Sequence, residues 1–129
     1  SNLFICSPHV SQIAALEAMS CEEELSQNLN IYSKNRQIIM DGLQHVGLDS
    51  FASPDGAFYF YIDISKYSDD SLSFCNDILK EVGVAITPGV DFDPERGKTT
   101  IRISYARSTD EIKEGVIRLS QFMKKRGYF

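Results

Sequence analysis

The sequence has no tryptophan, only three cysteines and four prolines, and no long hydrophobic run. No apolar stretch approaches the roughly 18 to 20 residues of a membrane-spanning helix, so we expect no membrane span. Basic residues are scarce, because 13 Lys and Arg stand against 18 Asp and Glu, a formal net charge of −5. A nucleic-acid-binding surface needs a basic patch or stripe, and we therefore expect no nucleic-acid partner.

The three cysteines, Cys6, Cys21 and Cys75, are widely spaced and form no C-x-x-C pair. Only His9 and His45 are available to complete a zinc site, so we predict no metal site. Free cysteines most often pack as small hydrophobic residues. Unpaired thiols are typical of a reducing compartment, and the sequence therefore indicates a cytoplasmic protein.

Several motifs that carry chemistry are missing. Gly97–Thr99 resembles the tail of a phosphate-binding loop, but that loop needs a glycine where Phe92 stands. No G-x-G-x-x-G fingerprint of a dinucleotide site occurs either. Asp91, Asp93 and Glu95 crowd one loop without the rest of a calcium-binding loop, so we interpret them as solvated.

Length and hydrophobic periodicity define the fold class. A chain of 129 residues has the usual size of one domain, which we predict over residues 1–129. Apolar residues recur every three to four positions in four segments and every second position in others, so helices and strands segregate. The order predicts an α+β fold, a small and mostly antiparallel sheet covered on one face by helices. The predicted helices span 7–19, 21–48, 69–83 and 108–129, and the predicted strands 56–65, 84–89 and 100–106.

Helix ends are indicated by capping residues. Ser7 is a plausible N-cap, with Pro8 at the first helical position. Gly47 is expected to end the long helix, and Ser108 with Glu111 forms a capping box. The residues expected to face the core are Leu25, Leu29, Tyr32, Ile39, Leu43 and Val46; Phe58, Phe60, Ile62 and Ile64; Leu72, Cys75, Leu79 and Val82; and Ile112, Val116, Leu119 and Met123.

The strand 100–106 carries the residue of greatest interest. Its isoleucines and tyrosine alternate with Arg102, Ser104 and Ala106, so the two sets face opposite sides of the sheet. A long cation between such small residues has two interpretations, a solvated surface ion pair or an arginine in an open site for an anion. Arg107 is expected at the end of the strand, in solvent.

Three motifs, in this order and spacing, resemble the carboxy-terminal segment of class I/II aminotransferases, the pyridoxal-phosphate enzymes of the aspartate aminotransferase fold. They are Pro54–Tyr59, which matches proline-x-glycine-x-phenylalanine-tyrosine, then Gly83–Phe92, and then Ile101–Ala106. The helices "SQIAALEAM" and "YSKNRQIIMDGL" also resemble those that lead into the small domain of these enzymes. The resemblance covers about residues 7 to 123.

The resemblance implies that Arg102 forms a bidentate salt bridge with the α-carboxylate of an amino acid or 2-oxo acid substrate. A planar guanidinium matches a carboxylate in a way that lysine cannot. It also implies that Gly56 and Gly89 lie near the substrate, where glycine permits close backbone approach. As plain turn residues these two need no such role, and both interpretations stay open. Tyr59 either reaches the site or only packs on the sheet, and we do not assign it.

The resemblance also defines what the chain lacks. In the family, the Schiff-base lysine, the aspartate that pairs with the pyridine nitrogen and most phosphate ligands lie in a large domain before this segment. Neither Lys34 nor Lys66, each preceded by serine, is followed by glycine-x-arginine-x-glycine. The resemblance thus implies a carboxy-terminal small domain without the large domain, without a catalytic residue and without its own pyridoxal phosphate. The abrupt start fits truncation, and the family is generally homodimeric.

The leading hypothesis is therefore one domain of a transaminase that exchanges an amino group between an amino acid and a 2-oxo acid. An alternative is a non-catalytic, carboxylate-binding or regulatory α+β module, and a third is a structural or dimerisation domain. Weak carboxylate binding that is lost in Arg102→Ala would distinguish the second from the third.

Overall fold

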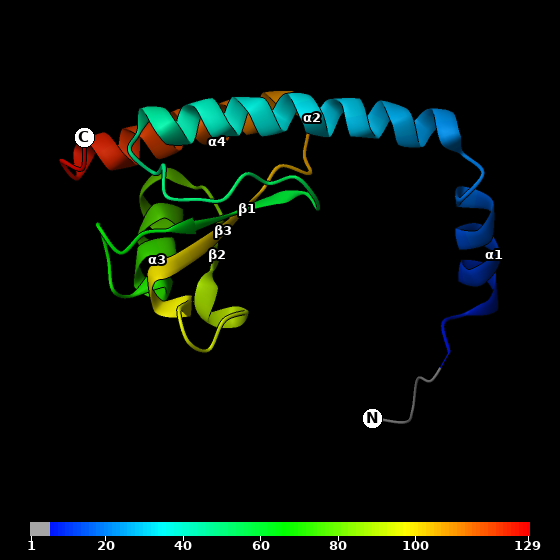
Figure 1. The fold of residues 1–129 in the computed structure, drawn as a ribbon, viewed down its shortest axis with the longest axis horizontal. Coiled ribbons are helices and arrows are strands. Elements are labelled where there is room, and N and C mark those ends of the chain that lie inside the picture. The colour runs from blue at the N-terminus through cyan, green and yellow to red at the C-terminus, as the bar shows by residue number, and fades with distance from the viewer. Residues whose placement is uncertain (1–5) are drawn as a thin grey trace. The chain divides into compact units, whose positions relative to one another are not determined.

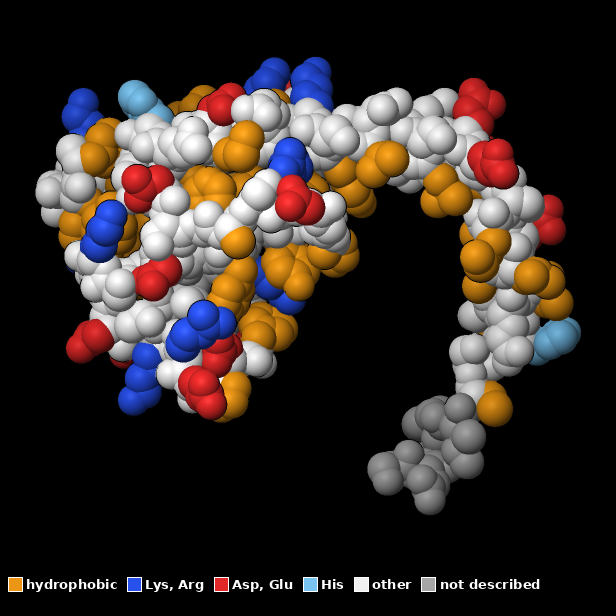
Figure 2. Space-filling view, viewed as in Figure 1, with side chains coloured by type: hydrophobic (Ala, Val, Ile, Leu, Met, Phe, Trp, Pro, Cys, Tyr) orange, Lys and Arg blue, Asp and Glu red, His pale blue; other side chains and the backbone are white. Residues whose placement is uncertain are grey.

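The computed structural model describes residues 6–129, which divide into two compact units that are described separately. The first ends at Asn30 and holds helix α1 (His9–Ala18) and the start of helix α2 (Glu22–His45). No residue of α1 is buried, and Figure 2 shows hydrophobic side chains uncovered along this unit. No helix in residues 6–129 is long and apolar enough to cross a membrane. The exposed large hydrophobic residues of this unit are Val10, Ile13, Leu16, Met19, Leu25 and Leu29.

The second unit, Ile31–Phe129, contains the sheet and its covering helices. The strands lie in the order β1-β3-β2, with antiparallel neighbours. In Figure 1, helices α2 and α4 run together along one face of the sheet, and Gly42 of α2 faces Val116 of α4. This confirms the predicted α+β class. Its elements after α2 are β1 (Tyr59–Asp63), α3 (Ser71–Val82), β2 (Thr87–Pro88), the 3₁₀ turns η1 (Gly89–Asp91) and η2 (Gly97–Thr99), β3 (Thr100–Ser104) and α4 (Thr109–Lys125).

The core lies between one face of this sheet and the helices. The predicted alternation in strand 100–106 is confirmed, because Ile101 and Tyr105 are buried while Ser104 is exposed. The predicted inner face of the last helix is also confirmed, with Val116 half-buried and the other three residues buried. The other buried hydrophobic residues are Ile39, Leu43, Val46, Leu48, Phe60, Ile62, Ile64, Phe74, Cys75, Ile78 and Phe122.

Some predicted core residues are exposed. Phe58 is 48% exposed because it precedes β1, just after Ala57, where the backbone adopts a positive φ of 58°. Of the predicted face of α3, Cys75 is buried and Val82 half-buried, as expected, but Leu72 and Leu79 are 53% and 49% exposed, so the predicted face was wrong at those two positions. The buried face is shifted toward Phe74, which contacts α4 through the Phe122 ring, 5.7 Å away.

Leu25 and Leu29 were also predicted to face the core and are 53% and 65% exposed. They belong to the first unit, in which no residue from 6 to 30 is buried. Helix α2 spans both units, so the apolar stripe at its start is exposed while its continuation after Asn30 is buried. The predicted core residues of α2 in the second unit are confirmed, with Tyr32 half-buried and the later three buried.

The helix ends agree with expectation at two of three places. Gly47 follows α2 with a positive φ of 78°, as predicted for a C-terminal glycine. The capping box of α4 is present, with the Glu111 amide donating to Ser108 Oγ. The N-cap of α1 was wrong by one residue, because Pro8 occupies it and offers no side-chain acceptor, and the Ser7 carbonyl instead accepts from Gln12 Nε2 at 2.8 Å.

A close contact between two backbone segments shapes the loop between β2 and β3. Gly89 and Gly97 are both buried, and a Cβ atom built on Gly89 would lie 2.6 Å from the Thr100 carbonyl oxygen and 2.8 Å from that of Gly97. The buried Ser71 hydroxyl donates to the Gly97 carbonyl at 2.6 Å and ties the loop to α3. The loop therefore closes on itself where two residues lack side chains.

We expect Gly89→Ala to lower the free energy of unfolding by about 1 to 3 kcal/mol, because the added methyl group overlaps backbone that cannot move without opening the loop. The measurement is urea unfolding of the 129-residue chain. Gly115→Ala is the matched control, since Gly115 lies in α4 with open space around its Cβ position and should gain roughly 0.5 to 1 kcal/mol from helix propensity. Equal effects in both variants would contradict the steric argument.

Candidate functional site

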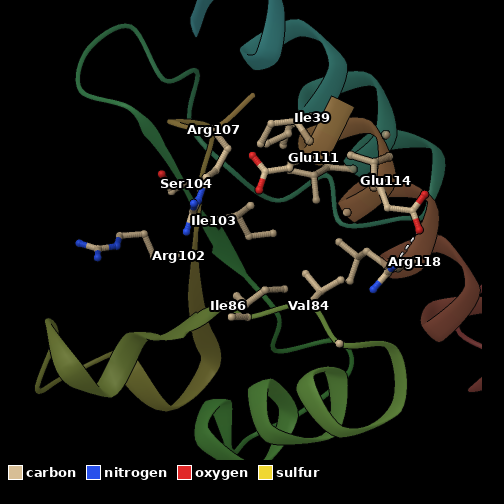
Figure 3. A pocket seen from close by; sticks show the side chains of 18 of the residues that line it. Ile39, Val84, Ile86, Arg102, Ile103, Ser104, Arg107, Glu111, Glu114 and Arg118 are labelled. Atoms are coloured by element: carbon tan, nitrogen blue, oxygen red, sulfur yellow. Dashed lines mark hydrogen bonds and ion pairs between the residues drawn. The ribbon is translucent and has the colours of Figure 1, made fainter. Parts of the chain in front are cut away.

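Arg102 lies at the centre of the sheet surface that faces away from the core. Strand β3 is the middle strand, and Arg102 pairs with Tyr61 of β1 and Thr87 of β2. In Figure 3 its side chain points away from Ile103, as expected for neighbours in a strand. The small and exposed Ser104 follows on the same face, so the side chain of Arg102 is only half-buried.

Two aromatic rings contact the guanidinium of Arg102. Its Cζ atom lies 4.0 Å from the ring centroid of Phe92 and 5.1 Å from that of Tyr59, which are cation–π distances. None of the ion pairs formed among residues 6–129 includes Arg102, and none of their side-chain hydrogen bonds does. The surface ion pair considered as an alternative is therefore not formed within this part of the chain. The guanidinium N–H groups are free to donate to a ligand.

Phe92 is held by a tightly bonded loop. Its amide and that of Asp93 both donate to the Gly89 carbonyl at 2.9 Å. The Asp93 carboxylate accepts from the Glu95 amide at 2.9 Å, from the Arg96 amide at 3.0 Å and from Arg96 Nε at 3.3 Å. The backbone N–H groups of Arg96 and Glu95 therefore hold the pKa of Asp93 below its ordinary value. This carboxylate is engaged by its own loop, and residues 6–129 contain no group of three side chains able to hold a metal ion.

The loop before Tyr59 is anchored by Arg36 of α2. Arg36 Nε donates to the Pro54 carbonyl at 2.9 Å, and Nη2 donates to Ser53 Oγ at 2.9 Å. Asp55 adds an ion pair at 3.5 Å. Arg36 therefore fixes the turn that leads into β1, and with it the position of Tyr59.

The end of β3 is anchored by Asn35 of α2, the residue before Arg36. Its fully buried side chain donates from Nδ2 to the carbonyls of Tyr105, at 3.1 Å, and Arg107, at 2.7 Å. The Tyr105 hydroxyl in turn donates to the Ala57 carbonyl at 3.0 Å. Asn35 thus joins α2 to the strand that carries Arg102, while the side chain of Arg107 is exposed, as expected.

The two glycines predicted near a substrate lie in different surroundings. Gly89 is buried and its close approach is to the protein's own backbone, whereas a Cβ on Gly56 would meet no atom within 4 Å. Each precedes by three positions an aromatic residue that contacts Arg102, Gly56 before Tyr59 and Gly89 before Phe92. Their loops therefore border the Arg102 site, and substrate contact by the glycines themselves stays a prediction.

A groove of about 630 Å³ lies on the other side of β3. Its walls combine half-buried apolar residues with charged residues that include the Glu114–Arg118 ion pair at 2.7 Å, seen in Figure 3. Arg102 borders the groove but points away from it, and neither Gly56 nor Gly89 lines it. The groove and the guanidinium therefore belong to opposite faces of the strand. Besides Arg102, its labelled wall residues are Ile39, Val84, Ile86, Ile103, Ser104, Arg107, Glu111, Glu114 and Arg118.

With this geometry established, comparison with known proteins decides the family. Residues 2–119 match the family described as aminotransferase class I and II. The chain belongs to this family. It is 44% identical over 95% of its length to a valine–pyruvate aminotransferase of Mycobacterium tuberculosis. It spans only 32% of that relative, so it corresponds to about a third of the length of the curated relatives it matches.

Solved structures of aminotransferases share the fold. An aminotransferase from Mycobacterium tuberculosis superposes with a TM-score of 0.87 at 44% identity, covering 96% of this chain and 33% of that one. A Silicibacter pomeroyi protein superposes with a TM-score of 0.90 at 52% identity, covering 96% of this chain and 34% of that one. The resemblance inferred from the three sequence motifs is therefore confirmed for both family and fold.

The family implies pyridoxal phosphate in the full-length protein, but the residues present do not fit a site for it. All seven lysines of the chain are exposed, including Lys34 and Lys66, and none lines the groove. A lysine that forms a Schiff base needs a site that lowers its pKa by burial or by a neighbouring cation. This aminotransferase segment therefore presents the arginine of the family motif without such a lysine.

The sequence did not identify the side chains that contact Arg102 or anchor the segments around it. Phe92 was part of the quoted motif, but its aromatic ring in a polar loop was not interpreted. Arg36 interrupted the apolar pattern of its helix, and a polar residue in an apolar stripe is a signal for a specific partner. Asn35 gave no signal, because its partners lie 70 and 72 positions away.

The hydrogen bonds to the Asp93 carboxylate predict that the stability of this loop depends on pH. Because the pKa of Asp93 is lower in the folded chain, its carboxylate contributes stability above its ordinary pKa of 3.8 and loses it as the pH falls through the folded value. We expect the Arg96 backbone amide signal, followed by NMR, to titrate with a midpoint below 3.8. Asp93→Asn keeps an acceptor oxygen and should abolish the titration. A midpoint at or above 3.8 would contradict the assigned hydrogen bonds.

Proposed function

We propose that this chain is the carboxy-terminal small domain of a pyridoxal-phosphate-dependent aminotransferase that moves an amino group between an amino acid and a 2-oxo acid. Arg102 is the proposed binding site for the substrate α-carboxylate. The observation that carries the proposal is the guanidinium of Arg102, which pairs with no carboxylate of residues 6–129 and lies at the arginine of the family motif, on an open sheet face. Family membership supports the same conclusion.

The chemistry of Arg102 matches this role. A guanidinium presents parallel N–H donors that bind both oxygens of a carboxylate, and such charge-assisted pairs are stronger than neutral hydrogen bonds. Phe92 and Tyr59 contact the group without using its N–H donors. The exposed Ser104, next on the same face, leaves space beside it. Arg102 would therefore fix one end of the substrate and set its orientation.

The remaining chemistry is assigned to a large domain outside this chain. Pyridoxal phosphate, when bound, supplies the electron sink for transamination, and the protein supplies binding and orientation. We propose that the catalytic lysine lies in the two-thirds of the relatives' length that this chain does not span. Closure of the small domain on the substrate would help to exclude water. The isolated chain is then inactive, and no transamination step is assigned to its residues.

The proposed substrates are α-amino acids and 2-oxo acids. The relatives include enzymes named for valine and pyruvate, for LL-diaminopimelate and for aspartate, so the amino acid differs between relatives while transfer of the amino group is shared. We also propose a homodimer in a reducing, cytoplasmic setting. Burial raises the pKa of the Cys75 thiol to about 12, which keeps it protonated, and Cys6 and Cys21 are also free thiols.

Arg102→Ala, in the full-length enzyme that contains this chain, should lower kcat/KM by the equivalent of about 3 to 5 kcal/mol, the scale of a broken buried charge pair. Arg102→Lys should recover only part of the loss, because an ammonium group cannot pair with both carboxylate oxygens in one plane. Arg107→Ala is the matched control, an exposed arginine five positions away, and should change little. Equal losses in Arg102→Ala and Arg107→Ala would refute the assignment.

The location of the cofactor site is tested by titrating the 129-residue chain with pyridoxal phosphate, followed by borohydride reduction and peptide mass mapping. We expect scattered, substoichiometric labelling of several lysines, because all seven are exposed. Stoichiometric labelling of a single lysine would show a cofactor site within this chain and would overturn the domain assignment. The matched control is the same titration of urea-unfolded chain, which should give a similar pattern.

A further inference from the structure

The contact between Phe92 and Arg102 is the shorter of the two cation–π contacts at the site, at 4.0 Å against 5.1 Å for Tyr59. Phe92 is 51% exposed and lies in a loop with Asp91, Asp93 and Glu95 as neighbours. It lies outside the buried hydrophobic cluster. The polar loop therefore carries one aromatic ring whose defined partner is the guanidinium of Arg102.

The loop is built to keep that ring in one place. Backbone hydrogen bonds to the Gly89 carbonyl, at 2.9 Å each, fix the amides of Phe92 and the next residue. The Asp93 carboxylate closes the following turn, and Gly89 packs against Gly97 with no room for a side chain. Hydrogen bonds before and after Phe92 therefore fix the backbone of this residue, and with it the position of its ring.

An aromatic ring restrains an arginine without competing for its hydrogen bonds. A carboxylate partner would occupy the N–H donors that a substrate needs, whereas a ring covers a planar face of the guanidinium and leaves the N–H edge free. Arginine carries substantial rotamer entropy, which binding must remove. A guanidinium already held against a ring loses less of this entropy when a ligand binds.

We infer that Phe92 is a positioning residue, which holds the guanidinium of Arg102 in the orientation that receives the substrate carboxylate. This inference rests on the proposed function of Arg102 and extends it to Phe92. Phe92 acts through Arg102 and forms no bond to the substrate. Its effect should therefore depend on the presence of both Arg102 and a carboxylate.

The test uses the full-length enzyme with pyruvate as the carboxylate probe and pyruvamide, its neutral amide, as the matched compound. Phe92→Leu keeps an apolar side chain and removes the ring. We expect it to raise the KM for pyruvate by about 3- to 10-fold, with a smaller effect on kcat, as for loss of a cation–π contact. Phe92→Tyr keeps an aromatic ring, so its KM for pyruvate should lie within about twofold of the wild-type value. Val90→Ala, an exposed residue of the same loop, is the control and should leave KM unchanged.

A double-mutant cycle separates positioning from a general structural role. In the Arg102→Ala background, Phe92→Leu should cause no further rise in KM, and inhibition by pyruvamide should be the same with and without the ring. A rise of equal size in the Arg102→Ala background, or an equal effect on pyruvamide, would overturn the positioning role.

Failure of the two proposals can be told apart. If Arg102→Ala raises KM and Phe92→Leu does not, the positioning role is overturned and the proposed function of Arg102 stands. If Arg102→Ala leaves KM for pyruvate unchanged, the carboxylate-binding function itself is overturned. Thermal unfolding of each variant identifies loss of folding, and the exposed Val90→Ala variant sets the baseline for a substitution in this loop.

Discussion

The contact between the backbones at Gly89 and Gly97 is the constraint on which the Arg102 site depends. Because neither residue has a side chain, the chain after β2 can fold back against the start of β3, with the Ser71 hydroxyl bonded to the Gly97 carbonyl. The loop closed in this way carries Phe92 over the neighbouring strand. A side chain at either glycine would overlap the backbone of the other segment, so we expect the loop that carries Phe92 to shift.

How much of the fold was predictable depended on whether local periodicity or packing decided the outcome. The face of β3 was predicted correctly because alternation along a strand is fixed by the backbone. The face of α3 was predicted only in part, because Leu72 and Leu79 fit a helical stripe as well as Phe74 does, and only the contact with Phe122 in a distant helix selects between them. The prediction for Phe58 was wrong for a related reason, since the positive φ at Ala57 delays the start of β1 to Tyr59 and leaves Phe58 outside the strand.

The candidate site was also predictable only in part. Arg102 could be identified from sequence because a strand pattern and a family motif coincide on one residue. The side chains around it could not, because they act across the fold: Asn35 bonds to carbonyls 70 and 72 positions away, and Arg36 bonds to a loop 18 positions away. These two adjacent residues of α2 fix the end of β3 and the entry to β1. One helix thereby sets both the strand that carries the arginine and the strand that carries Tyr59.

The charges of the chain explain why Arg102 remains available. Acidic residues outnumber basic ones, 18 to 13, so an unpaired arginine is not expected from composition alone. Two partly buried carboxylates are occupied elsewhere, with Glu81 bound to Lys125 and Arg126, and Asp93 bound within its own loop. Aromatic rings take the place that a carboxylate would otherwise fill beside Arg102. The positive charge is thus stabilised by partners that accept no hydrogen bond from its N–H edge, which leaves that edge for an external carboxylate.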